Sequence, residues 1–524
     1  MHGVLRLGLL GLCLSLLVGC AGAQAGSQHS QEALAGRVPV EATDIFFLDL
    51  KPEGQVGRDW VRFLTRLEQI PEGRDALDAM LAGFEVKAYP IHDLVSGSGV
   101  SGTWNRVHYA ILRIADAEAV RQAMHAPEVG ATWTEEKYGG RLLYDGAGTD
   151  RDGRPRFISW SATKDLLYVV SSTHNSPLPQ LKSLLDLPED ESLAALPAWR
   201  TLADRLPDEA VALYFTRPPR QPAPPPADAS RRDLLVAHLQ ALALAVVPDE
   251  GGLRIQIEGT LSDDAVDVPE IRALYDLTAL DPDSWPGLPA DTAVAIMGHD
   301  APTTWPWAYS VLDLDVDGPF RLLRQGLALD LADLLGPEGP LAGPFAFGLL
   351  PPQPDEPASG QLPAGQFLVL APEASARDAT RLRADMEGLG ATFDTVEVDG
   401  VELQRGVGTG AGGYALTYAL EAGVLTIGSS PTVVARSVLN TRRQEGLVQE
   451  EAFRRACSAI LRDPAIFVYG SIPRLAELAE ANAAVGLPRA DELGLLGVFD
   501  AVAAGIRLNH SEIQGAIYLS LAGE

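Results

Sequence analysis

The sequence contains little cysteine, and this shortage limits how the fold can be held together. Its 524 residues include three cysteines, Cys13, Cys20 and Cys457. We expect Cys13 to leave with an N-terminal targeting segment and the thiol of Cys20 to be modified, so Cys457 has no second thiol with which to form a disulfide in the mature chain. The fold must therefore be stabilised by apolar burial, and hydrophobic residues make up 46% of the sequence.

Positive charge is also scarce. Lysine and arginine number 41 against 70 aspartate and glutamate residues, which gives a formal net charge of −29. Proteins that bind nucleic acid normally present a basic face that replaces the counterions of the phosphates. No cluster of lysine and arginine stands out here, so we expect no nucleic-acid partner.

Histidines are few and scattered. The nine histidines include no pair at helical i, i+4 spacing. His92 and His299 each precede an aspartate, but adjacent residues point in different directions in regular structure, so neither sequence predicts a catalytic dyad. We predict no catalytic residue, no metal ligand and no cofactor.

Three short matches to known signatures fall in the wrong structural context. The segments 97–102 and 408–413 fit G-x-G-x-x-G, but strand patterns follow them, whereas a dinucleotide site needs a helix there. Ser161 and Lys164 fit S-x-x-K across a strand-to-turn boundary, and the sequence has no K-T-G. Cys457 lies in a helical apolar pattern, which favours a small buried residue over a nucleophile.

The N-terminus carries a targeting signal. Arg6 precedes an apolar run of residues 7–18, which is too short to span a bilayer. The run ends at Leu-Val-Gly-Cys20, which resembles the lipobox of bacterial lipoprotein precursors. We expect a signal peptide over 1–19, acylation of Cys20, and a lipidated tether over 20–35; the alternative is an ordinary signal peptide with an incidental cysteine.

This resemblance implies an exported protein that is anchored to a membrane through the lipid on Cys20. It would lie on the periplasmic or cell-surface side. Ala21, in place of aspartate after the cysteine, resembles the outer-membrane sorting pattern, so we expect the outer membrane if the envelope has two membranes.

The landmarks of the first half of the chain recur in the second half in the same order and at nearly the same spacing. Each half opens with a proline-and-acid turn that leads into a short apolar strand. The matching segments are 38–48 and 288–297, 138–143 and 398–403, 158–162 and 416–420, 166–172 and 424–430, 206–214 and 461–469, and 253–261 and 513–521.

The patterns within these segments favour the α+β class. Leu253, Ile255 and Ile257 alternate with polar residues, as in an antiparallel strand with one wet face. Residues 116–124 and 375–386 have helical patterns. We predict two tandem homologous lobes, each an antiparallel sheet of about seven to nine strands with helices on one face. The expected boundaries are 36–262 with a proline-rich loop at 216–229, a linker at 263–287, and 288–524.

Three of these segments resemble a family of bacterial exported proteins that is catalogued only as a domain of unknown function. They are residues 288–296, residues 192–199 with Ser-Leu-Ala and Pro-Ala-Trp, and residues 206–214. The chain is similar to two tandem copies of this domain. The resemblance implies a lipoprotein or membrane-anchored location, and it implies no catalytic residues.

These observations predict a cell-envelope lipoprotein that works by binding or scaffolding and has no catalytic activity. One alternative is a hydrolase whose site is assembled from residues distant in sequence. Another is a carrier of a hydrophobic ligand. The tryptophans near predicted strands or loops could line a groove for an apolar or sugar ligand, although core packing explains most such residues; they are Trp104, Trp133, Trp160, Trp305 and Trp307. The identity of a protein or hydrophobic small-molecule partner stays open.

Overall fold

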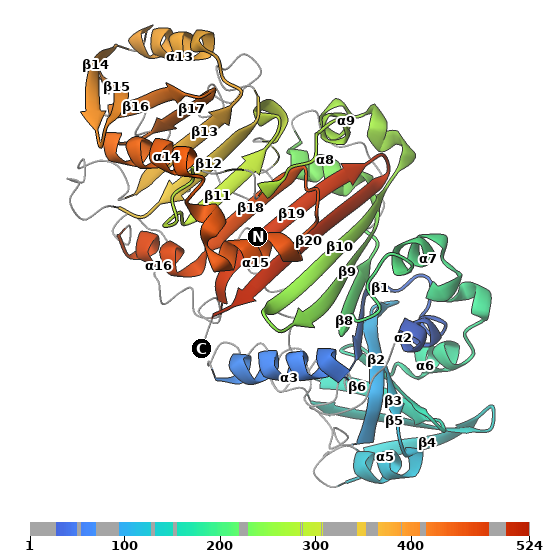
Figure 1. The fold of residues 1–524 in the computed structure, drawn as a ribbon. Coiled ribbons are helices and arrows are strands. Elements are labelled where there is room, and N and C mark those ends of the chain that lie inside the picture. The colour runs from blue at the N-terminus through green and yellow to red at the C-terminus, as the bar shows by residue number, and fades with distance from the viewer. Residues whose placement is uncertain are drawn as a thin grey trace. The chain divides into compact units, whose positions relative to one another are not determined.

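A computed structural model describes most of the chain outside the N-terminal segment. The described residues are 28–49, 54–69, 94–126, 132–149, 155–218, 229–282, 285, 287–304, 307, 343–352, 365–388, 390–408, 415–481 and 499–522. The predicted signal peptide, Cys20, His92 and Trp305 lie outside them. The fold belongs to the α+β class, with antiparallel strands and helices that pack on them (Figure 1).

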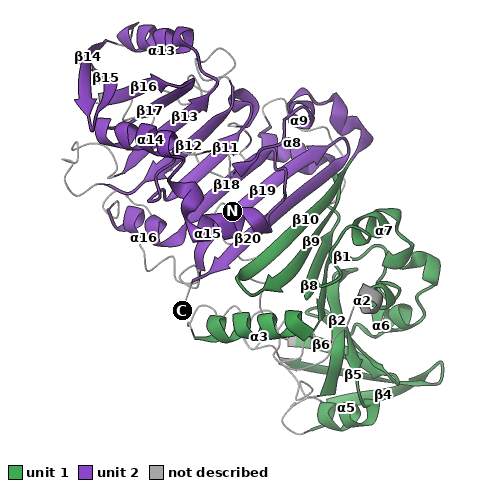
Figure 2. Ribbon diagram, viewed as in Figure 1, with its two compact units in different colours: residues 1–219, 239–261 green, residues 220–238, 262–524 purple. Residues whose placement is uncertain are grey.

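The chain divides into two compact units (Figure 2). Unit 1 comprises residues 1–219 and 239–261, and unit 2 comprises residues 220–238 and 262–524. The segment 263–287, which the sequence predicts as a linker, belongs to unit 2: it forms a 3-10 turn at Asp263–Asp267 and helix α9 at Pro269–Tyr275, and it places Leu280 and Trp285 in that unit's core.

The described strands of unit 1 form one antiparallel sheet of ten strands, slightly more than the sequence predicts. The spatial order is β4-β5-β6-β7-β3-β2-β1-β8-β9-β10. The bounds in that order are Thr132–Tyr138, Arg141–Thr149, Pro155–Ala162, Leu166–Ser172, Val107–Ile114, Val95–Trp104, Thr43–Asp49, Ala212–Thr216, Leu239–Asp249 and Gly252–Leu261.

The described strands of unit 2 form a ten-stranded antiparallel sheet in the order β14-β15-β16-β17-β13-β12-β11-β18-β19-β20. Its bounds in that order are Ala391–Val398, Val401–Gly408, Ala415–Glu421, Val424–Gly428, Gln366–Pro372, Phe345–Leu350, Val294–Gly298, Ile466–Ser471, Phe499–Asn509 and Glu512–Leu521. Numbered from its own first strand, this is the strand order of unit 1.

Tight turns join neighbouring strands in both units. The two central residues have positive φ in the β2–β3, β4–β5, β14–β15 and β16–β17 hairpins. This is the type I′ geometry, which matches the twist of the flanking strands. The residues are Asn105-Arg106, Gly139-Gly140, Asp399-Gly400 and Ala422-Gly423.

The helical patterns at 116–124 and 375–386 correspond to helices α5 and α13. The described helices of unit 1 are α2 (Gln28–Ala35), α3 (Gly54–Glu68), α5 (Ala117–Met124), α6 (Leu178–Leu185) and α7 (Pro197–Ala203). Besides α9, those of unit 2 include α8 (Arg231–His238), α13 (Ala376–Gly388), α14 (Pro431–Arg443), α15 (Glu451–Ala459) and α16 (Ile472–Ala481). Helix α2 occupies residues that the sequence predicts as tether, and Leu34 at its end is buried.

The helices of unit 1 cover both faces of the sheet, whereas the sequence predicts one face. Trp160 on β6 is paired with Val169 on β7, so both point to one face. His125, at the end of α5, lies edge-on to Trp160 with ring centroids 5.8 Å apart. Val170 points to the other face and shares a core cluster with Leu181 of α6. The reason is visible in central strands such as β3, where the consecutive residues 109–112 are all buried, so both faces need cover.

Candidate functional site

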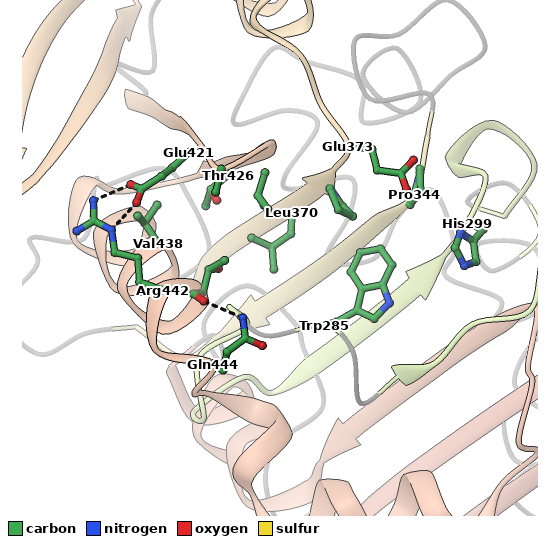
Figure 3. A pocket seen from close by; sticks show the side chains of 14 residues that line it. Trp285, His299, Pro344, Leu370, Glu373, Glu421, Thr426, Val438, Arg442 and Gln444 are labelled. Atoms are coloured by element: carbon green, nitrogen blue, oxygen red, sulfur yellow. Dashed lines mark hydrogen bonds and ion pairs between the residues drawn. The ribbon is translucent and has the colours of Figure 1, made fainter.

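A pocket in unit 2 is the candidate site. It has a volume of about 470 Å³ and lies over β13 and the β16–β17 hairpin, beside the end of α14 (Figure 3). Fourteen residues line it: Trp285, His299, Pro344, Leu370, Pro372, Glu373, Glu421, Ala422, Val424, Thr426, Val438, Thr441, Arg442 and Gln444.

The inner wall of the pocket is apolar and rigid. Leu370 on β13 is paired with Thr426 on β17, and each is only 1% exposed. Val438 of α14 is 3% exposed and packs in the same core cluster as Leu370. Because these groups belong to a paired sheet and a helix packed on it, the pocket exists before any ligand arrives.

One end of the pocket carries an ion pair. The Arg442 guanidinium meets the Glu421 carboxylate through two hydrogen bonds, Nε–Oε1 at 2.5 Å and Nη2–Oε2 at 2.7 Å. The hydrogen bond from Arg442 holds the pKa of Glu421 below its usual range. The two side chains are 43% and 38% exposed, so the pair lies at the rim, and it leaves little charge at this end unpaired.

The end of α14 is positioned by its cap. Gln444 adopts the left-handed conformation with φ 56°, and its side-chain Nε2 donates to the carbonyl of Thr441 at 3.1 Å. This terminates the helix directly after Arg442 and Arg443, where cations are favoured by the helix dipole. Thr441 and Arg442 therefore face the pocket from a fixed last turn.

Trp285 forms the wall at the other end, and a glycine sets its place. Gly287 has φ 115°, and a Cβ added there would lie 2.5 Å from Thr441 Oγ1 and 3.3 Å from Leu370 Cδ1. No other residue type fits this close approach without rearrangement. Trp285 itself is 8% exposed and packs into the core.

His299 and Glu373 lie on the side of the pocket away from Arg442, near Trp285 and Pro344 (Figure 3). His299 directly follows β11, and Glu373 directly follows β13. Glu373 is exposed and has φ 65°, an uncommon conformation for a residue other than glycine. Among the residues that the structure describes, its carboxylate has no hydrogen-bond or ion-pair partner.

This set of groups is suited to holding a molecule. The fourteen lining residues include no serine and no cysteine, and Thr441 Oγ1 donates to the carbonyl of Ser437 at 3.0 Å. The described side chains of the pocket therefore supply one aromatic wall, apolar surface and a few polar groups, which is the usual composition of a small-molecule site.

The structure separates His299 from the aspartate beside it. Asp300 accepts a hydrogen bond from Thr303 Oγ1 at 2.6 Å at the start of a short helix, while His299 lines the pocket. Ser161 is fully buried and donates to the carbonyl of Leu142 at 2.9 Å, as expected for a structural serine. Cys457 is half-buried and packs against the core.

Among the tryptophans singled out from the sequence, the four that the structure describes do not line this pocket. Trp133 and Trp160 lie edge-on with centroids 5.8 Å apart, and Trp133 Nε1 donates to the carbonyl of Met124 at 2.8 Å. Trp307 is buried and donates to the carbonyl of Glu270 at 3.2 Å. Trp285 was not among them. Its sequence context, Trp-Pro-Gly ahead of a strand, is nevertheless a turn signal that places an aromatic residue directly beside a turn.

Neither a metal centre nor a membrane-spanning helix is found in the described part of the chain. No group of three or more histidine, cysteine, aspartate or glutamate residues there is arranged to hold a metal ion. None of the described helices combines the length and the apolar content that crossing a bilayer requires.

Comparison with known proteins identifies no family for this chain. No family model matches the sequence, and no curated protein matches it significantly. Among solved structures, crystal form I of TP0453 is similar at 11% identity, with 43% of this chain and 78% of that chain covered and a TM-score of 0.26. Crystal form III of TP0453 gives 12% identity, 47% and 87% coverage, and the same TM-score. A TM-score of this size is too low to show a common fold.

Proposed function

We propose that the protein is an exported, membrane-anchored lipoprotein that binds a small molecule in the pocket of unit 2 and performs no catalysis on it. The observation that carries this proposal is the preformed cavity of about 470 Å³ between β13, β17 and α14. Its size and mixture of apolar and polar groups are those of small-molecule sites.

The two units are, in this proposal, tandem copies of one domain, the domain of unknown function that the sequence resembles. Their identical strand order supports this. A second feature recurs in detail: Trp133 covers Gly146 in unit 1, and Phe393 covers Gly406 in unit 2. In each case a Cβ on the glycine would lie 2.7 Å from the ring, so the glycine is required by the aromatic residue above it.

Superposing the strand registers of the two copies explains why the pocket is in unit 2. Thr426 is paired with Leu370 and Ala419, and Tyr168 is paired with Ile111 and Ser161 at the equivalent place. Tyr168 is 4% exposed and packs in the core of unit 1. A threonine in place of a tyrosine therefore leaves open a volume that the first copy fills with a ring.

The helix beside the pocket also differs between the copies. Helix α14 has 13 residues, whereas α6, which follows the equivalent strand in unit 1, has 8. The additional turns carry Thr441 and Arg442, which line the pocket. The second copy thus has a smaller side chain at this core position and a longer helix beside the pocket.

Native mass spectrometry tests the binding proposal. The full chain is purified from its own host in a non-ionic detergent, and we expect a co-purifying molecule of defined mass. The substitution Thr426→Tyr restores the ring found in unit 1 and should abolish the adduct. Thr392→Tyr, at an exposed position of β14, is the matched control and should retain it. An apo mass for the unmodified chain, or an adduct that survives Thr426→Tyr, would refute the proposal.

The lipid anchor is tested separately. Acylation of Cys20 with two or three chains would hold the protein stably at a membrane, whereas a single chain binds only marginally. Replacing Cys20 with alanine should move the protein to the soluble fraction and abolish labelling by radioactive palmitate. Labelling that persists in the variant would contradict this part of the proposal.

A further inference from the structure

We infer that the pocket of unit 2 takes a small organic cation, an ammonium or quaternary ammonium group attached to an apolar body. This inference rests on the proposed binding function and specifies the ligand class. It follows from how charge is distributed over the lining residues and from where the aromatic wall stands.

The charges of the pocket leave one carboxylate for a ligand. Glu421 is already engaged by both hydrogen bonds from Arg442, so this pair offers a ligand little net charge. Glu373 has no such partner among the described residues. An anion would meet an unpaired negative group, whereas a cation would neutralise it.

The aromatic wall stands at the same end as this carboxylate. Trp285, His299 and Glu373 all line the side of the pocket away from Arg442 (Figure 3). Because Trp285 is 8% exposed and fixed in the core, its ring is held in place for a ligand. An indole ring is the best aromatic partner for a cation, and a nearby carboxylate adds to the attraction.

The carboxylate is a feature of the second copy alone. In each unit, one residue of the neighbouring strand is paired with the first residue of β7 or β17. Ile114 directly follows that residue in unit 1, and Glu373 directly follows it in unit 2, so the two positions are equivalent. Ile114 is 4% exposed. At this position the chain thus has a buried apolar residue in unit 1 and an exposed acid in a left-handed conformation in unit 2.

The apolar body of the ligand would lie on the inner wall. Leu370, Val424 and Val438 present hydrocarbon surface between the two polar ends. A purely polar cation would leave this surface hydrated, so an ammonium group on a compact hydrocarbon body fits better.

Three probes of nearly equal shape test the charge preference. They are choline, its neutral counterpart 3,3-dimethylbutan-1-ol and the anion 3,3-dimethylbutyrate. Their methyl singlets are followed by ligand-observed NMR titration against the full chain in a non-ionic detergent at pH 8 and low salt, with micelles alone as the blank. We expect choline to bind about fivefold more tightly than the alcohol, and the butyrate to bind most weakly.

Variants assign the preference to residues. Glu373→Gln should lower the affinity for choline toward that for the alcohol, because only the contribution of Trp285 remains, and should leave the affinity for the alcohol unchanged. Glu397→Gln removes the same charge from an exposed position of β14 outside the pocket and should change neither affinity. Thr426→Tyr should abolish binding of choline and the alcohol.

Equal affinities for the three probes, no detectable binding of choline, or a choline affinity unaffected by Glu373→Gln would each overturn the inference. Failure of the ligand class is distinguishable from failure of the proposed function. If the native adduct is lost in Thr426→Tyr while choline shows no preference, the pocket is still a binding site but not one for cations. If no adduct exists, the proposed function itself fails.

Discussion

The substitution Gly287→Ala should destabilise unit 2 by about 2–5 kcal/mol. An L residue in the positive-φ region costs about 1–2 kcal/mol. Overpacking by an added methyl group costs about 1–3 kcal/mol more, and the new Cβ would lie 2.5 Å from Thr441 Oγ1. The two terms act at the backbone that carries Trp285, so the pocket wall should shift as well.

A double-mutant cycle separates the two terms. Thr441→Ala removes the hydroxyl that the new Cβ meets and gives up its hydrogen bond to Ser437, which on a helix changes stability by no more than about 0.5 kcal/mol. In the double variant the overpacking part of the loss, about 1–3 kcal/mol, should be recovered, and the backbone part should remain.

Hydrogen exchange with mass spectrometry in increasing urea is the suitable assay, because two compact units need not unfold in one transition. Peptides from β17 and α14 report on unit 2, and peptides from β6 and β7 serve as the internal reference. A Gly287→Ala variant within 0.5 kcal/mol of the unmodified chain, or no recovery in the double variant, would refute the steric reasoning.

Two further predictions concern unit 2. Gly406→Ala should lower its stability by about 1–3 kcal/mol, because the Cβ would lie 2.7 Å from the Phe393 ring; an unchanged urea midpoint would contradict this. Arg442→Met removes the hydrogen bonds that lower the pKa of Glu421. A carboxyl whose pKa is lowered in the folded state contributes stability that is present above its unfolded pKa and is lost as pH falls through its folded pKa. The variant's urea midpoint should therefore be reduced near pH 7, and the difference from the unmodified chain should shrink toward pH 3. A constant difference between these pH values would refute it.

The fold class and most elements were readable from the sequence because strand and helix periods are local properties. The helical patterns at 116–124 and 375–386 became α5 at 117–124 and α13 at 376–388. The face that each helix covers was not readable, because it depends on tertiary packing. β3 is buried on both faces, and its near-continuous apolar sequence was the available signal.

The register of the strands was the second feature that the sequence did not predict. The sequence match of 206–214 with 461–469 aligns Tyr214 with Tyr469. In the structure Phe215 points into the core of unit 1, and Tyr469 points into the core of unit 2. Under the proposed duplication the match is therefore displaced by one residue on this strand. Since side chains alternate between the two faces of a strand, a shift of one residue exchanges every inward-facing and outward-facing residue. The apolar residues of the two segments are too similar in type to reveal such a shift.

The pocket was outside the reach of sequence reasoning for a related reason. Trp285, Glu373 and Arg442 come from three separate segments, and only pairing in the sheet and the length of α14 bring them to one cavity. His299 was noted for its neighbouring aspartate, but its place in the pocket follows from the end of β11. The signal that was available is the contrast between the two halves, Thr426 against Tyr168 in matching strands.

The central position of the first strand in each sheet has a consequence for how the chain folds as it emerges. β1 is paired on one side with β2, the next strand along the chain, but its other side is closed only by β8, after β2–β7 have all been made. The same holds for β11 with β12 and β18. Such long-range pairing raises the contact order and slows folding. Each unit thus keeps an unpaired strand edge in the middle of its sheet until its last three strands form. In the proposed export, this part of the sheet would still be open while the chain crosses the membrane.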